Sequence, residues 1–168
     1  MKKTISTEQT SANIAQVMAL LAETPQKLAE LSAGLSDGAL HKPLGVGERS
    51  FIENLAHLLN TEARTSESIY LALLENEPLF INVHAEHQWG QLLHYEAYPF
   101  ANLLTYFKFR RTILLGVLGG LSAAHWSRTI REAGKQRRES VYWRARVQAL
   151  HELEHRMDLE KKLAGSER

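Results

Sequence analysis

The sequence predicts an all-α protein, a four-helix bundle with a long loop between its first and second helices. Apolar residues recur at helical spacing in four long segments, and connections rich in glycine or proline separate these segments. No convincing alternation of apolar and polar residues predicts a β-strand anywhere. At 168 residues the chain can bury one substantial core, so we expect a single bundle domain over residues 1–168.

The first predicted helix begins at a capping box formed by Ser6 and Gln9 and stops near Gly34. Pro25 suits the first turn of a continuing or restarted helix. Residues 34–48 hold four of the ten glycines and one proline, a composition that predicts the long loop. The apolar positions of this helix recur every three or four residues: Ile14, Val17, Met18, Leu21, Leu28 and Leu31.

A second capping box, Ser50 with Glu53, opens the second predicted helix, which ends before Pro78. Residues 78–96 have mixed character and predict a loop with a short turn of helix. They lead to Pro99, the residue that can start the third helix.

The third predicted helix stops at Gly119-Gly120. A basic linker follows, and Ser140 then caps a fourth helix that ends at Gly165. Four long helices are the number that a simple bundle requires.

Composition limits the classes of function. The formal net charge is +1, so no global field favours nucleic acid or an acidic partner. The absence of cysteine excludes disulfides, thiolate ligands and a cysteine nucleophile, so any thiol chemistry needs a thiol from outside the protein. No secretory or membrane-spanning apolar run is present. We expect a cytoplasmic protein that acts on a small molecule, without nucleic-acid or membrane partners.

The stretch HELEH places His151 and His155 four residues apart on the last helix, where both can bind one metal ion. These histidines continue a series at steps of four that begins with Trp143 and Val147 and ends with Leu159. We therefore expect both rings to face the bundle interior.

The same letters fit the zinc-protease motif, but the rest of that pattern is missing. Position 161 is Lys and position 158 is Asp, where the compact pattern needs His and Gly. Only thirteen residues follow His155, and neither Glu160 nor Glu167 can return from a separate element as the third ligand. The protease interpretation is therefore disfavoured.

A better third ligand lies upstream, in the middle of the second predicted helix. Bundle metal sites use inward-facing side chains from different helices, and His57 occupies such a position in FIENLAHLLNTEA. We predict a metal site formed by His57, His151 and His155. Three neutral imidazoles would leave one side of the ion open.

The segments PLGVGERSFIENLAHLLNTE, YPFANLLTYFKFRRTILLGVLGGL and ALHELEHRMDLEKKL together resemble the DinB-like superfamily over most of the chain. This resemblance implies a four-helix bundle that binds a divalent metal, zinc or nickel, through His57, His151 and His155. Relatives with known activities use low-molecular-weight thiols in S-transfer, and others are described as metal-dependent hydrolases. Relatives often form dimers, which implies a homodimer here. Where the family often has Trp-Ser, this chain has Arg49-Ser50-Phe51, a departure that bears on substrate more than on metal.

Three classes of function remain open. The first is a metal-dependent enzyme that activates a low-molecular-weight thiol for S-transfer. The second is a metal-dependent hydrolase that uses water at the same site. The third is a non-catalytic metal-binding or stress-related protein. Cationic or amide groups near the site would favour S-transfer, and a carboxylate near the open position would favour hydrolysis.

Other polar residues carry weaker expectations. Glu152 points about 100° away from His151 on the helix and is expected in solvent, and Glu154 is expected in solvent or beside the ligands. Glu62 could orient a ligand or face solvent. Arg110 and Arg111 are interpreted as a surface pair, although either could touch an anionic substrate.

Three further histidines, His84, His87 and His94, belong to the segment that should pass near the open end of the bundle. They are expected to be polar surface, with a second metal site or substrate contacts as alternatives. The seven basic residues between Arg128 and Arg146 are interpreted as a solvated linker and helix face that could attract an anionic cofactor.

Overall fold

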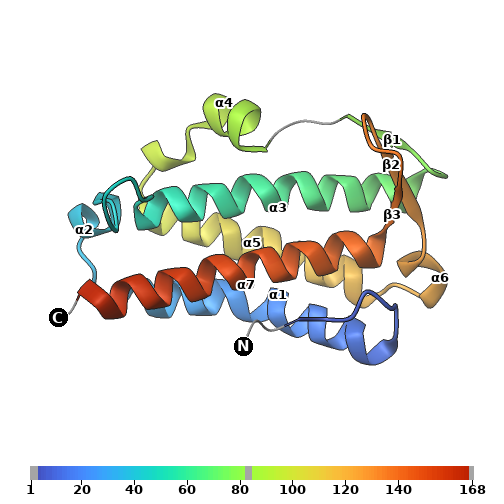
Figure 1. Ribbon diagram of the computed structural model, residues 1–168, viewed down its shortest axis with the longest axis horizontal. Coiled ribbons are helices and arrows are strands. Elements are labelled where there is room, and N and C mark those ends of the chain that lie inside the picture. The colour runs from blue at the N-terminus through green and yellow to red at the C-terminus, as the bar shows by residue number, and fades with distance from the viewer. Residues whose placement is uncertain (1–3, 82–84, 167–168) are drawn as a thin grey trace.

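The computed structural model describes residues 4–81 and 85–166. Four long helices run along the longest axis of the molecule (Figure 1). They are α1 (Ser11–Ser32), α3 (Phe51–Leu74), α5 (Phe100–Gly119) and α7 (Val141–Ser166). The predicted four-helix bundle is confirmed.

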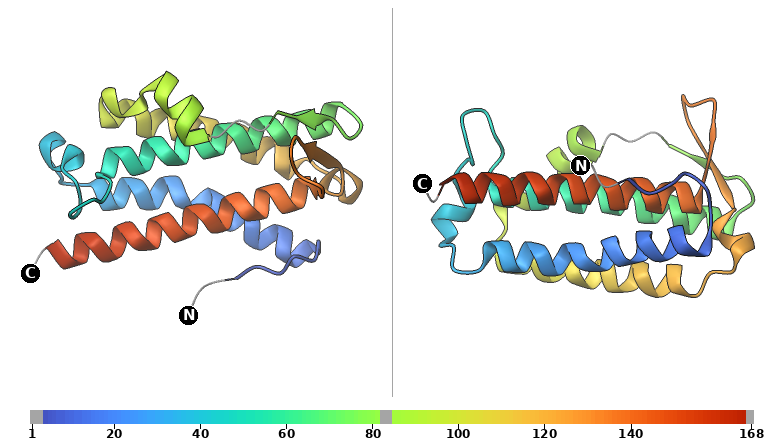
Figure 2. Two further views of the ribbon diagram at one scale, coloured as in Figure 1. Left: turned by 45° about the horizontal axis from the view of Figure 1, so that its top comes forward. Right: turned by 60° about the horizontal axis from the view of Figure 1, so that its bottom comes forward.

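Helices α1 and α3 lie diagonally opposite each other, and each packs against both α5 and α7. In the right-hand view of Figure 2, α3 and α7 form the upper layer and α1 and α5 the lower one. The first and third connections therefore cross the bundle diagonally. This arrangement places α3 beside α7, the two helices that carry the candidate metal ligands.

Two apolar clusters form the core, one toward each end of the bundle. Leu21, Ile69, Leu114 and Tyr142 belong to the first cluster, and Leu28, Phe51, Leu55, Phe107 and Leu159 to the second. Between them each long helix contributes buried polar side chains: Thr24, Glu62, Thr65, Arg111, Gln148 and Glu152. A buried polar layer thus divides the apolar core at mid-length.

Three of the four long helices begin where the sequence predicts. Ser50 and Glu53 form both hydrogen bonds of the capping box, Pro99 precedes α5, and the Ser140 hydroxyl accepts from the backbone N–H of Trp143. The first helix is different, because Thr10 and not Ser6 caps α1.

The reason lies in tertiary contacts of the residues before α1. Ile5 is buried in the core, and the Tyr142 hydroxyl and the Arg146 guanidinium donate to the backbone carbonyls of Ser6 and Ile5. These bonds hold the segment extended along α7, so the helix starts only after it.

The predicted long loop over residues 34–48 contains a short helix, α2 (Asp37–His41), capped by Ser36. At the other end of the bundle lie α6 (Ala123–Trp126) and a small sheet (Figure 1). No helix within the described residues is both long enough and apolar enough to cross a membrane.

The expectation that the chain holds no strand is wrong. Strand β1 (Leu79–Phe80) pairs in parallel with β2 (Thr129–Glu132), which pairs antiparallel with β3 (Arg138–Ser140). Ile130 and Glu132 point inward while Arg131 is exposed, so β2 does alternate. Because one inward residue is a glutamate, no apolar alternation is visible in the sequence.

Residues 85–97 form an arm against α3, which we call the α4 arm. It consists of a π-helical turn, η1 (Ala85–Gly90), then α4 (Gln91–Leu93) and a 3₁₀ turn, η2 (Tyr95–Ala97). The arm packs on α3 through η1 and η2. It is more regular than the predicted loop, and it lies over α3 (Figure 1).

Candidate metal centre

The two helices that carry the histidines are held in place by their ends. The capping box at Ser50 starts α3 two turns before His57. At the far end, the Arg128 guanidinium donates to the backbone carbonyls of Ala72 and Glu75, which closes the last turn of α3. On α7, His151 and His155 lie one turn apart, and both face α3.

The structure brings the three histidine rings together. The ring centroids of His57 lie 5.0 Å from His151 and 4.6 Å from His155, and those of the α7 pair lie 4.5 Å apart. One ring nitrogen from each residue can be chosen so that all three lie within 4.8 Å of one another. Imidazoles from two distant parts of the chain thus converge on one point.

The donor set fits a divalent ion. Ligand nitrogens at about 2.0–2.1 Å from a tetrahedral ion lie roughly 3.3 Å apart. The Nε2 atoms of His57 and His151 are 2.9 Å apart. Without an ion, one of the two nitrogens must carry a proton and donate it in a hydrogen bond to the other at this distance. With an ion, both nitrogens can direct their lone pairs at it. Three neutral nitrogens would leave one coordination position open, as in catalytic zinc sites.

Burial keeps one of these rings neutral. The pKa of His155 falls from 6.5 to about 4, first because the ring is desolvated and then because of the nearby charges of His151 and Arg49. An imidazole must be neutral to bind a metal, so His155 is ready to do so at neutral pH.

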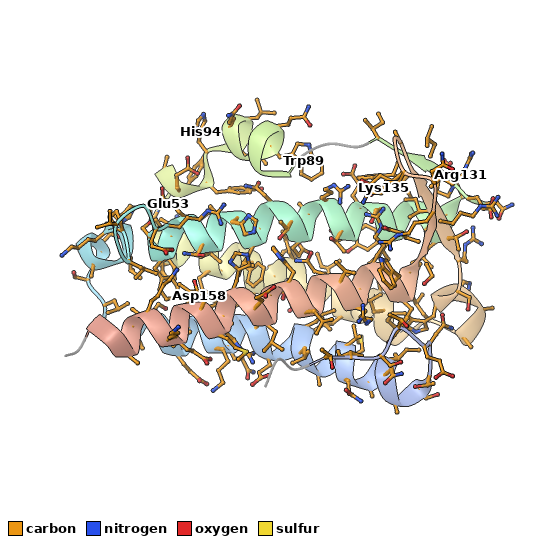
Figure 3. The ribbon with its side chains drawn as sticks, viewed as in Figure 1. Glu53, Trp89, His94, Arg131, Lys135 and Asp158 are labelled. Atoms are coloured by element: carbon orange, nitrogen blue, oxygen red, sulfur yellow. The ribbon has the colours of Figure 1, made fainter. Side chains whose placement is uncertain are left out.

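A cleft of about 260 Å³ reaches the centre at His57. Its lining comes from two sides, namely Arg49, Glu53 and Asn60 on or just before α3, and Gln91, His94 and Glu96 on the α4 arm. Figure 3 shows Glu53 on the α3 side and His94 on the arm. The tri-histidine cluster is therefore accessible from this cleft.

The expectation that Glu152 faces solvent is wrong. Its side chain is 0% exposed, and its carboxylate accepts two hydrogen bonds from Arg111, of 2.8 and 2.5 Å. Arg111 is itself 2% exposed and crosses from α5 to α7 through the core. The interpretation of Arg111 as a surface residue is therefore also wrong.

The predicted series at steps of four along α7 does not lie on a single inward face, and the reason is geometric. Each step of four residues advances about 40° beyond a full turn, so five residues at such steps spread over about 160°. Val147 is accordingly 44% exposed, while Leu159 is buried. The centre of the buried face runs through Gln148 and Glu152, and the two histidines lie at its edge, half-buried.

Glu62 is also buried and does not face solvent. Its carboxylate accepts from Arg110 Nε at 2.5 Å, and Arg110 donates as well to the Ser66 hydroxyl at 3.0 Å. Burial raises the pKa of Glu62, although the charge of Arg110 opposes this. Arg110 is half-buried. Each arginine of the predicted surface pair therefore forms an ion pair with a glutamate of a neighbouring helix.

The remaining expectations fall in two regions. His84 and the side chain of His87 lie outside the described residues. His94 is exposed, has a left-handed backbone with φ 44°, and lies 3.4 Å from the Glu96 carboxylate. Glu154 is exposed.

Most of the basic run is exposed as predicted, since Arg131, Lys135, Arg137 and Arg138 all face solvent, but the linker forms the β2–β3 hairpin. Arg144 is buried, and its guanidinium forms ion pairs with Glu132 at 2.5 Å and with Glu139 at 2.7 Å. Arg137 pairs with Glu139 and lies over the ring of Trp143. These charges fasten the β2–β3 hairpin to α7.

Sequence reasoning missed Asn60 as a member of the site. Asn54, His57 and Asn60 recur every three residues on α3, a polar series on a helix face that is otherwise apolar. That spacing was the available signal, because inward polar residues at helical intervals need partners or a ligand.

The model of the DinB superfamily matches residues 20–158, most of the chain and all four long helices in whole or in part. The chain belongs to the DinB superfamily. The three histidines that converge in the structure are the residues that the resemblance implied. This DinB-superfamily chain matches no curated protein.

Among solved structures, the chain is similar to a protein described as "YfiT from Bacillus subtilis is a probable metal-dependent hydrolase with an unusual four-helix bundle topology". The two share 14% sequence identity at a TM-score of 0.83, over 96% of this chain and 91% of that one. At this identity the likeness shows the fold alone.

Proposed function

We propose that this protein binds a divalent metal ion through His57, His151 and His155 and hydrolyses a small polar substrate in the adjoining cleft. The observation that carries the proposal is the convergence of three ring nitrogens from α3 and α7 beside an open cleft. Zinc and nickel both suit imidazole ligands. The described function of the structural neighbour, a probable metal-dependent hydrolase, supports the same class of reaction.

A divalent ion bound there supplies a Lewis acid and can lower the pKa of water from about 15.7 toward 7. The chain supplies the rest. Glu53 and Glu96 are the carboxylates that line the cleft among the described residues, and with the imidazole of His94 they are groups able to accept a proton there. Glu53 is held still, because its Oε2 accepts from the backbone N–H of Ser50 at 2.6 Å.

A second candidate, S-transfer to an electrophile from a low-molecular-weight thiol, has its own support. A polar thiol cofactor needs cationic and amide groups to hold it, and the cleft offers the Arg49 guanidinium together with the amides of Asn60 and Gln91. The ion that activates water can equally hold a thiol as thiolate.

Metal content tests the binding step. Purified without a histidine tag and dialysed, the wild type should retain about one zinc or nickel ion per chain by elemental analysis. His57→Ala and His151→Ala should each lower that content at least tenfold with little loss of helix, because two imidazoles hold an ion poorly. His125→Ala is the control, since His125 lies in α6, bonded to Ser122. Equal metal content in all four proteins would contradict the proposal.

Turnover separates the classes of function. Metal-loaded protein should be offered esters, amides and electrophiles, with and without several small thiols. Turnover without thiol supports the hydrolase, and turnover only with thiol supports S-transfer. No turnover under either condition would favour a non-catalytic metal-binding protein.

A further inference from the structure

Asn60 lies one turn after His57 on α3 and lines the same cleft. The residue is 4% exposed, yet its carbonyl oxygen Oδ1 has no hydrogen-bond partner among the residues that the structure describes. Buried side-chain acceptors in folded proteins are almost always paired, and an exception at the wall of a cleft calls for a ligand.

Another asparagine on the same helix provides a direct comparison. Asn54 is also buried, at 6% exposed, but its Nδ2 donates to the backbone carbonyl of Ser50 at 2.9 Å. Asn54 thus reinforces the start of α3. The Oδ1 of Asn60, six residues further along α3, has no such partner among the described residues.

The position of Asn60 limits the chemistry of the ligand. Side chains three residues apart on a helix have Cβ atoms about 5–6 Å apart, so one small group can reach both His57 and Asn60. An amide or hydroxamate carries an oxygen that can bind a metal ion and an N–H directly beside it. The cleft is small, about 260 Å³, and apart from Gly90 its lining residues carry polar side chains, so a small polar ligand suits it better than a large apolar one.

We propose that Asn60 is a ligand-binding residue whose Oδ1 accepts a hydrogen bond from the N–H of a small amide held at the tri-histidine centre. This rests on the proposed function and names its substrate class. Asn60 then selects amides over esters and carboxylates, which lack the N–H. In hydrolysis of such an amide, the oxygen of water bonds to the carbonyl carbon, the C–N bond breaks, and a proton from that water passes to the departing nitrogen.

Binding of two probes to zinc-loaded protein tests the proposal without using activity. Acetohydroxamic acid carries the N–H and acetate does not, so the ratio of their affinities, measured by titration calorimetry, isolates the hydrogen bond. In Asn60→Leu this ratio should fall about tenfold, the usual effect of one hydrogen bond. In Asn60→Asp, which keeps an acceptor oxygen, the ratio should stay within threefold of wild type. Asn60→Ala replaces the leucine variant if leucine hinders folding.

Asn54→Leu is the matched control, with the same substitution on the same helix. It should leave the affinity ratio unchanged and lower the melting temperature, because it removes a bond that holds α3. Asn60→Leu should melt at or above the wild-type temperature, since it removes a buried acceptor that has no partner.

The zinc content of each protein distinguishes a failure of the proposed role of Asn60 from a failure of the proposed metal site. An unchanged affinity ratio in Asn60→Leu with zinc bound would overturn the role of Asn60 and leave the metal centre standing. A wild type without zinc would overturn both.

Discussion

Arg111 joins three of the four long helices, because its guanidinium reaches from α5 to both α1 and α7. Pro25 has no N–H, so the carbonyl of Leu21, four residues earlier in α1, lacks its helical donor. Arg111 Nη1 donates to that carbonyl at 2.6 Å and also pairs with Glu152 on α7. The Arg111 guanidinium thus supplies the donor that Pro25 cannot give to the Leu21 carbonyl, and it balances the charge of the Glu152 carboxylate beside His151.

We expect the loss of one member of the Arg111–Glu152 pair to destabilise the fold strongly, and the loss of both members to destabilise it less than the two single losses combined. Glu152→Gln should lower the free energy of unfolding by about 3–5 kcal/mol, because the charge of Arg111 stays buried without its counter-ion. The double variant Arg111→Met, Glu152→Gln should lose less than the sum of the losses of Arg111→Met and Glu152→Gln alone. Urea denaturation measures all four proteins. Additive losses would show that the two side chains are not coupled.

At this scale the sequence predicted which histidines meet but not their surroundings. The i, i+4 spacing of His151 and His155 follows from helix geometry alone. The burial of Glu152 depends on Arg111, which lies 41 positions away on another helix. No local pattern records such a pair.

At the scale of elements, two serines give opposite predictions. Ser50→Ala should lower the free energy of unfolding by about 1 kcal/mol, since it removes the cap of the helix that carries His57. Ser6→Ala should change it little, because the Ser6 hydroxyl accepts only in an exposed turn, from the backbone N–H of Glu8. Denaturation in urea checks both. Equal losses would restore Ser6 as a cap.

The β2–β3 hairpin makes its own prediction through Glu132. Burial acts to raise the pKa of this carboxyl, but hydrogen bonds from Arg144 and Lys135 outweigh it and leave the pKa below 4.5. A depressed folded pKa contributes stability that is present above the unfolded value and is lost as pH falls through the folded one. The wild type should therefore be more stable than Glu132→Gln, and this difference in the free energy of unfolding should be largest at pH 7.

The stability advantage over Glu132→Gln should shrink steadily below about pH 4.5. Urea midpoints of both proteins at pH 7, 4.5 and 3 measure it. An advantage that grows in acid would contradict the assignment of these ion pairs.

Across the whole molecule, the buried polar layer lies between two apolar clusters. Apolar burial at both ends stabilises the bundle, while the middle holds the Arg110–Glu62 and Arg111–Glu152 ion pairs. Buried charges at mid-length contribute little net stability but define how the helices register. His151 therefore lies directly beside this polar layer, next to Glu152.

A metal ion at this level would join α3 to α7 and should stabilise the fold. With free zinc at about 100 times its dissociation constant, linkage predicts a gain of about 2.7 kcal/mol, lost when EDTA is added. Thermal melts with and without EDTA measure the shift. His151→Ala should melt at the same temperature in both conditions. A wild type insensitive to EDTA would contradict a metal shared by the two helices.

The sequence by itself determined the four long helices, most of their starting residues and the three histidines, because helical spacing and capping depend on neighbours a few residues apart. Tertiary structure alone decided that residues 4–9 stay outside the first helix, that the basic linker forms a hairpin, and that Glu62, Arg111 and Glu152 are buried in the core. A charged side chain can be buried only opposite its counter-charge. In this bundle the counter-charges come from helices and strands that are distant in sequence.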